Sequence, residues 1–277
     1  MAGMVQKVMR FTKVEHTVFS LPYLFAGAWL GAGGRLPSMK TVLLLVMAGI
    51  GARVLGMAMN RILDRHIDAK NPRTKDRELP AGSLSLRAAS LTALGGFLVY
   101  EAACVMLGEL IVYLSPIPAL VLIGYSLLKR FTPLCHFGIG LTLGLAPLGA
   151  YVATTLSTEV TADILLLSGF AFFWISGFDI IYALLDEEFD RQNRVRSIPS
   201  ALGGKGAQIV AAVSHLAAFS ALVGLSVLAG DGPLIYLALT VSAGAFIAAH
   251  LPFIPIPVRF FPISAVAGIA GALVPFF

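Results

Sequence analysis

Apolar runs alternate with short polar connections along nearly the whole chain. Nine stretches of roughly 18–25 residues are each long enough to cross a bilayer as a helix. They lie at about 17–33, 40–60, 84–107, 109–128, 134–156, 161–183, 206–229, 233–251 and 258–276. Spanning backbone must form helices or a closed barrel, and these runs are too long and too uniformly apolar for barrel strands. The pattern therefore predicts an all-α polytopic membrane protein with about nine transmembrane helices.

The composition supports a single membrane domain over residues 1–277. The chain is 57% hydrophobic and only 13% charged, whereas soluble domains are about 25% charged. No polar region of the chain is long enough to form a large soluble domain. The net charge is +5, and the basic residues that produce it lie between the apolar runs. This placement favours charged cytoplasmic loops over a nucleic-acid partner.

The basic residues predict the orientation of the spans. With a cytoplasmic N-terminus, 17 of the 20 lysines and arginines fall on the cytoplasmic side, while Arg35 and Lys40 fall outside and Arg53 lies within a span. The positive-inside rule therefore favours this orientation. It makes both long connections, 61–83 and 184–205, cytoplasmic.

The connection 61–83 opens with a group of polar residues at the end of the second apolar run. Asn60, Asp64 and Asp68 are spaced by four, so a continuing helix places all three on one face. Oxygen-bearing side chains of this kind suit a hard cation such as Mg²⁺, which commonly serves phosphate groups. Cations suited to a diphosphate follow directly: Arg73, Lys75 and Arg77.

The connection 184–205 repeats this chemistry at the end of the sixth run. Four side chains share a stripe of about 80° if the helix continues: Asp179, Tyr182, Asp186 and Asp190. Basic residues again follow: Arg191, Arg194 and Arg196. Either motif alone is typical of solvated loop charge. The pair favours a functional site, because both motifs continue from a span at the same membrane face and both precede bases.

The two motifs end spans two and six, four helices apart. This spacing predicts two related four-helix halves plus a ninth helix. Arg53 lies seven residues before the first motif, on the same helix face and roughly 10 Å deeper. Two roles remain open for it: a cation that faces an anionic substrate, or an ion pair with Asp179 at a similar depth. The five histidines have no mutual ligand spacing, so no zinc site is predicted.

At these residues the chain resembles the UbiA superfamily of intramembrane prenyltransferases. The resemblance runs from KVEHTVFSLPYLFAG through NRILDRHIDAKNPRTKDRELPAG and YSLLKRFT to YALLDEEFDRQNRVRSIPS, and so covers nearly the whole chain. The sequence of these motifs is most similar to the 4-hydroxybenzoate polyprenyltransferase-like branch, including members associated with futalosine-route menaquinone synthesis.

The resemblance implies a central cavity among the helices, open to lipid and capped by the two loops. It implies two Mg²⁺ ions that bridge a prenyl diphosphate to the metal-binding residues Asn60, Asp64, Asp68, Asp186 and Asp190. Lys129 and Arg130 end the fourth span, where they are either diphosphate ligands or ordinary positive-inside anchors. The expected diphosphate contacts are Arg73, Lys75, Arg77, Lys129, Arg130, Arg191 and Arg194. The expected catalytic residues are Asp64, Asp68, Asp186, Asp190, Tyr182 and Arg53, with the ring of Tyr182 facing the cation.

The expected reaction is Mg²⁺-dependent transfer of a polyprenyl group from its diphosphate to an aromatic acid, of the 4-hydroxybenzoate or dihydroxynaphthoate type, in quinone synthesis. The expected location is a bacterial or archaeal cell membrane, with the N-terminus and both loops cytoplasmic. Two alternatives stay open. One is a prenyltransferase with a non-quinone acceptor, such as haem or a glycerol phosphate lipid. The other is an ion-coupled transporter, although its acids would be expected nearer mid-span.

Overall fold

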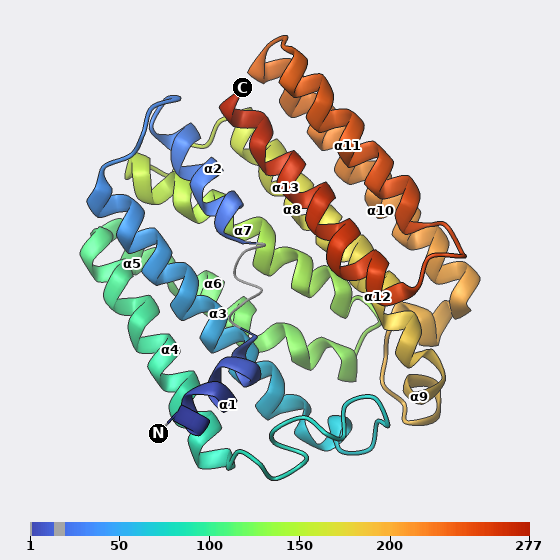
Figure 1. The fold of residues 1–277 in the computed structure, drawn as a ribbon. Coiled ribbons are helices and arrows are strands. Elements are labelled where there is room, and N and C mark those ends of the chain that lie inside the picture. Colours follow the sequence, from blue (N-terminus) through green and yellow to red (C-terminus); the bar gives the residue numbers. More distant parts are fainter. Residues whose placement is uncertain (1, 14–19) are drawn as a thin grey trace.

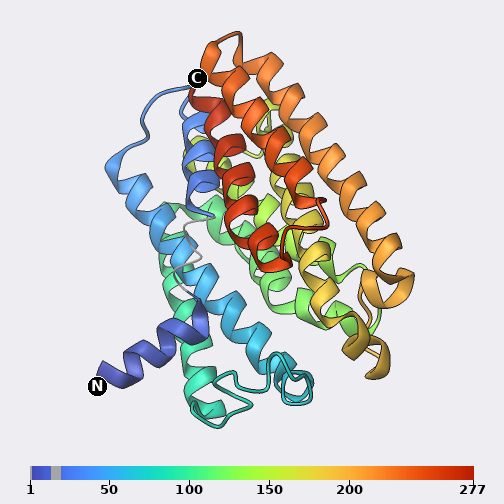
Figure 2. The ribbon, with the colours of Figure 1, turned by 45° about the vertical axis from the view of Figure 1, so that its right-hand side comes forward.

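The structure, a computed structural model, describes residues 2–13 and 20–277, so Glu15, His16 and the start of the expected span 17–33 lie outside it. Every regular element of the described chain is a helix (Figure 1), which confirms the all-helical fold. The first helix, α1 (Ala2–Thr12), projects sideways from the bundle beside α3 (Figure 2). Its last turns are anchored there, since Phe11 is fully buried against α3.

Seven helical segments of the described chain are long and apolar enough to cross a membrane. They are α3 (Met39–Asp68), α4 (Leu86–Leu107), α5 (Glu109–Leu114) with α6 (Pro116–Gly124) and η2 (Tyr125–Arg130), α7 (Cys135–Thr155), α8 (Ala162–Ala183) with η3 (Leu184–Asp186) and α9 (Glu187–Gln192), α10 (Ile198–Ala229), and α12 (Ile256–Val258) with η4 (Arg259–Ile263), α13 (Ser264–Leu273) and η5 (Val274–Phe276). Two shorter apolar helices, α2 (Leu21–Gly31) and α11 (Pro233–Ala249), occupy the places of the remaining expected spans. The chain is thus a multi-pass membrane protein, while the number nine stays a prediction.

The helices that carry the acidic motifs end differently from one another. α3 continues without a break to Asp68, as the spacing of the first motif predicts. α8 instead ends at Ala183, and the 3₁₀ turn of η3 separates it from α9, so the continuous helix considered for the second motif is wrong. The connection 184–205 is also shorter than expected, because α10 already begins at Ile198 and bends at Gly203, whose φ is 71°.

The packing of the bundle is similar around both motif helices. α3 packs along α4, α8 packs along α10, and α7 lies between the two motif helices (Figure 1). Each motif helix thus packs on the long helix that follows it, as expected for two related halves.

A close contact between α13 and α8 fixes the ninth helical segment. The fully buried indole of Trp174 donates from Nε1 to the Ser264 carbonyl over 3.1 Å. The Tyr23 hydroxyl of α2 donates to the Gly268 carbonyl over 2.9 Å. A Cβ at Gly268 would lie 2.2 Å from Cζ2 of Trp174, so only glycine allows this approach, as is usual where membrane helices pack closely.

Candidate active site

The first acidic motif is assembled on one face of α3. Asn60 donates from Nδ2 to Oδ2 of Asp64 over 3.1 Å, and the Lys129 ammonium lies 2.6 Å from the same oxygen. One turn further, Nη1 of Arg77 lies 2.9 Å from both oxygens of Asp68. Asp64 is only 1% exposed and Asp68 6% exposed. The buried carboxylates therefore depend on these two bases, since an unpaired buried charge is strongly destabilising.

The second oxygen of Asp64 is held less fully. Nη1 of Arg130 lies 3.8 Å from Oδ1 of Asp64, too far for a hydrogen bond, while Nη2 donates to the Leu63 carbonyl over 2.6 Å. Oδ1 of Asp64 is buried without a hydrogen-bond partner among the described residues. A buried acceptor of this kind is costly unless something occupies it, and a bound cation would do so.

The loop that follows the first motif forms hydrogen bonds with the second motif. Asn71 donates from Nδ2 to Oδ1 of Asp186 over 2.8 Å, and Nε of Arg73 donates to the same oxygen over 2.9 Å. Nη2 of Arg73 also pairs with Oδ2 of Asp186, so the contact is bidentate. Burial lowers the pKa of Arg73, but the hydrogen bond and charge of Asp186 outweigh burial and raise that pKa above its usual value. The guanidinium therefore stays charged.

Tyr182 and Asp190 complete the second motif, the first in contact with Arg73 and the second with Ser197. The Tyr182 hydroxyl accepts from Nη1 of Arg73 over 3.1 Å, and the Arg73 guanidinium also lies 5.1 Å from the centroid of the ring. The Asp190 carboxylate accepts from the Ser197 hydroxyl over 2.8 Å. Ser197 is also the N-cap of α10, so the start of that helix positions the last acid.

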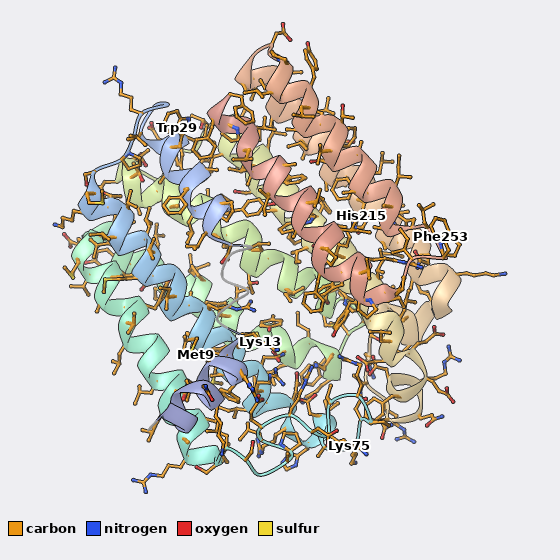
Figure 3. All side chains as sticks on the ribbon, in the orientation of Figure 1. Met9, Lys13, Trp29, Lys75, His215 and Phe253 are labelled. Carbon is orange, nitrogen blue, oxygen red and sulfur yellow. The ribbon has the colours of Figure 1, made fainter. Side chains whose placement is uncertain are left out.

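Three of the expected diphosphate ligands pair with none of the motif carboxylates. Arg191 instead contacts Glu187 at 2.7 Å, with its side chain 61% exposed. Lys75 and Arg194 are exposed, and Figure 3 places Lys75 on the loop after α3, at the end of the bundle that carries the motifs. Their role toward a diphosphate remains a prediction.

Arg53 lines a largely apolar cavity of about 320 Å³, whose wall is formed by residues of α2, α3, α4, α5, α6 and α7. It is the one charged side chain among the described residues that line this cavity, which extends past Tyr100 to Ser115. Its Nη2 donates to the Lys13 carbonyl over 3.3 Å. Asp179 pairs with His136 at 2.7 Å, so the ion pair between Arg53 and Asp179, the structural alternative, is not formed.

The donor set fits a hard cation. Carboxylate and amide oxygens are the ligands that Mg²⁺ prefers, and one carboxylate oxygen, Oδ1 of Asp64, is buried and unsatisfied. Within the described ranges, however, no three acidic, histidine or cysteine side chains converge closely enough to hold a metal ion. The bases occupy the carboxylates instead, so ion binding would require their rearrangement.

Sequence reasoning missed four residues that hold the motif side chains and Asp179. They are Asn71, which binds Asp186; Ser126, which accepts from Asn60; Ser197, which binds Asp190; and His136, which binds Asp179. Only Ser197 carried a signal, because a serine two residues before a proline is a typical helix start.

Two acidic motifs at one end of an apolar helical bundle, joined by a basic loop, define an intramembrane enzyme. Residues 20–255 match the model of the UbiA prenyltransferase family, and the chain belongs to that family. This confirms the family that the motifs resemble.

Individual relatives agree with this assignment. A 4-hydroxybenzoate octaprenyltransferase of Shewanella halifaxensis is 29% identical over 229 residues, covering 81% of this chain and 78% of that protein. The solved apo structure of a UbiA homologue from Aeropyrum pernix K1 has a TM-score of 0.82 and 30% identity, covering 94% of this chain and 96% of the homologue. A UbiA homologue from Archaeoglobus fulgidus, solved with GPP and Mg²⁺, has a TM-score of 0.69 at 18% identity, covers 98% of this chain and 100% of that one, and shows the shared fold.

Proposed function

We propose that this enzyme transfers a polyprenyl group from a polyprenyl diphosphate to an aromatic acid of the 4-hydroxybenzoate or dihydroxynaphthoate type. The observation that carries the proposal is the juxtaposition of charged and apolar surfaces. The bases Arg73, Arg77 and Lys129 gather on the motif acids, and a largely apolar cavity lies deeper in the same bundle. Support also comes from the relative of Shewanella halifaxensis, which is named for this class of reaction.

The bases and acids would act on the diphosphate as follows. The residues that would hold Mg²⁺, for which we propose two ions, are Asn60, Asp64, Asp68, Asp186 and Asp190. Bound Mg²⁺ would supply charge neutralisation for the leaving diphosphate. The guanidinium of Arg73 can bind phosphate oxygens bidentately, and the ammonium of Lys129 adds a point charge. Together these groups favour breakage of the allylic C–O bond, because they stabilise the charge that develops on the leaving group.

The apolar cavity has a separate task. Its lining provides a water-poor environment for a polyprenyl chain and protects the allylic cation from hydrolysis. Arg53, which lines it, can bind an acceptor carboxylate with two parallel hydrogen bonds. It would thereby orient the electron-rich ring toward C1 of the prenyl chain.

The same reasoning supports the location. The basic loop residues that surround the motifs favour a cytoplasmic site in a bacterial or archaeal cell membrane, with the N-terminus on the same side. Accessibility of single cysteines placed in the loop that carries Lys75, measured in intact and opened cells, tests this orientation. Labelling in intact cells by an impermeant reagent would overturn it.

The reaction itself can be tested with the protein in lipid nanodiscs. The protein is incubated with Mg²⁺, a radiolabelled polyprenyl diphosphate and a panel of aromatic acids, haem and glycerol phosphate lipid, and the products are identified. We expect a prenylated hydroxybenzoate or dihydroxynaphthoate, and no product in excess chelator. Transfer only to haem or to the glycerol lipid would replace the aromatic acceptor. The absence of any transfer, with intact protein, would overturn the prenyltransferase proposal.

A further inference from the structure

A second cavity opens where the start of α10 and the end of α11 meet α12 and η4 (Figure 1). It has a volume of about 510 Å³ and shares no lining residue with the apolar cavity that Arg53 lines. None of the motif residues lines it either. Three polar side chains contribute to its otherwise apolar wall: Gln208 of α10, His250 after α11 and Arg259 of η4. The reaction described above uses none of them.

Arg259 is anchored in the protein but has no partner of opposite charge. Only 5% of the residue is exposed, and its Nε donates to the Ile254 carbonyl over 2.6 Å. That is the one hydrogen bond that the guanidinium makes to a described residue, and no ion pair within the described ranges includes it. A covered guanidinium without a counter-charge is costly. An anion in the cavity would supply the missing charge.

Gln208 is held so that its amide nitrogen is available as a donor. Its Oε1 lies 3.0 Å from Nδ1 of His250, and because a carboxamide oxygen can only accept, Nδ1 donates to it. Nε2 of His250 in turn lies 3.0 Å from Nδ1 of His215, a buried ring that stacks on Phe246 with centroids 4.8 Å apart. The oxygen of Gln208 is therefore occupied, while its amide N–H groups meet no acceptor among the described residues.

The charges around the cavity suit an anion. No acidic side chain lines it among the described residues. Lys205 is exposed and precedes Gln208 by three residues and Ala212 by seven, so it lies on the same face of α10 as these two wall residues. Cations and N–H donors bind phosphate oxygens. The ammonium of a zwitterionic headgroup, by contrast, would find no carboxylate in the cavity wall.

The cavity opens toward lipid at the level of the headgroups. Its wall residue Ile209 is exposed, and so is Phe253, which Figure 3 places at the outer edge of the bundle. Exposed apolar surface of this kind in a membrane protein contacts acyl chains. Leu184, another wall residue, precedes Asp186 by two positions. The cavity thus lies at the membrane end that carries the acidic motifs.

We propose that this cavity binds the headgroup of an anionic phospholipid. The phosphate accepts hydrogen bonds from the guanidinium of Arg259 and from the amide of Gln208, and Lys205 adds a positive charge beside it. The acyl chains continue along the exposed face of α10 that carries Ile209. Basic pockets between membrane helices at the cytoplasmic side suit such headgroups. The inference concerns lipid binding alone and holds whatever the acceptor of the prenyl group is.

The test uses the purified full chain in a neutral detergent, with dioleoylphosphatidylglycerol as the probe. Native mass spectrometry over a lipid titration gives the dissociation constant of the first bound lipid. Three variants each remove one positive charge: Arg259→Gln, Lys205→Gln and Arg87→Gln. Arg87 is the control, because it is exposed near the start of α4 and lines neither cavity.

We expect binding to weaken at least about tenfold in Arg259→Gln, through loss of hydrogen bonds to a charged group. It should weaken about fivefold in Lys205→Gln, which removes one attractive charge near the phosphate, and stay unchanged in Arg87→Gln. Equal weakening in all three variants would show attraction by net charge alone and overturn the site. An unchanged affinity in folded Arg259→Gln would refute it as well.

Competing compounds identify the source of the phosphate. Dioleoylphosphatidylcholine carries the same phosphodiester with a positive choline, and we expect it to bind at least about fivefold more weakly. Neither inorganic phosphate nor magnesium diphosphate, the ligand proposed for the motifs, should displace the bound phosphatidylglycerol. Equal affinity for the two lipids would leave only a groove for acyl chains and overturn the headgroup site. Displacement by either free anion would assign the cavity to that anion instead of a lipid.

Melting temperatures in detergent establish which variants fold. Should Arg259→Gln fail to fold, the exposed pair Lys205→Gln and Arg87→Gln still decides, since equal affinities of these two variants for phosphatidylglycerol would overturn the proposal.

Discussion

The contact between α13 and α8 allows a quantitative prediction about stability. In Gly268→Ala the added methyl group would lie 2.2 Å from Cζ2 of Trp174, well inside van der Waals contact. Trp174 cannot move aside easily, because it is fully buried and its ring stacks on Tyr23, with centroids 5.3 Å apart. Any displacement would also stretch its hydrogen bond to the Ser264 carbonyl.

The cost follows from these two consequences. Overpacking of a well-packed interior costs about 1–3 kcal/mol, and loss of the indole hydrogen bond adds about 1 kcal/mol. We therefore expect Gly268→Ala to lower the free energy of unfolding by about 2–4 kcal/mol. Gly244→Ala on α11 is the matched control, since its methyl group would meet nothing within 4 Å. That change should be neutral or stabilise by up to about 1 kcal/mol through helix propensity.

The assay is reversible unfolding of the purified protein in mixed micelles of increasing SDS content, followed by tryptophan fluorescence. Trp174 and Trp29 are the two tryptophans of the chain, so the signal includes the change in environment of Trp174 on unfolding. A midpoint for Gly268→Ala equal to that of wild type and Gly244→Ala would refute the reasoning, and with it the closeness of α13 to α8.

The motif acids, the bridging base and the cavity cation each give a substitution with a measurable result. Asp64→Asn should cut turnover at least about 10²-fold by weakening stabilisation of the leaving group, whereas Asp163→Asn, at the opposite end of α8, should not; full activity of the first would contradict its role. Arg73→Ala should raise the KM for prenyl diphosphate about tenfold through loss of charged hydrogen bonds, and Arg35→Ala, in the exposed connection before α3, should leave it within twofold; equal effects would argue against a specific role for Arg73. Arg53→Lys should raise the KM for the acceptor and spare that for the diphosphate, so an unchanged acceptor KM in folded protein excludes this role.

The sequence contained enough information for the first half of the site. The spacing of Asn60, Asp64 and Asp68 predicts a helix that runs to Asp68, and α3 does so. Local periodicity suffices there because all three residues belong to one unbroken helix. The bases were also predicted as a group, and Arg77 and Lys129 do lie on the acids.

The second half depended on information that local periodicity does not contain. The break after Ala183 and the start of α10 at Ile198 are set by turns and a serine cap, so hydropathy alone assigns the segment to a loop. The contact between Asn71 and Asp186 joins residues 115 positions apart. Such a partner depends on how the two halves pack, which no window along the chain records.

The pairing of acids with bases also governs how a ligand can enter. Asp64, Asp68 and Asp186 each have a close basic partner, and Arg130 lies 3.8 Å from Asp64 as well, so these carboxylates are already neutralised by bases before anything binds. If a divalent ion bound alone, the displaced bases would be left without a partner of opposite charge. If a diphosphate bound alone, the carboxylates would be left without one. Both groups are partly buried, where an unpaired charge is costly. When the ion and the diphosphate bind together, the carboxylates pair with the ion and the bases pair with the diphosphate, so that no charge is left unpaired. The loop that holds Asp186 through Arg73 is therefore expected to bind metal and diphosphate as a single unit, with each raising the affinity for the other.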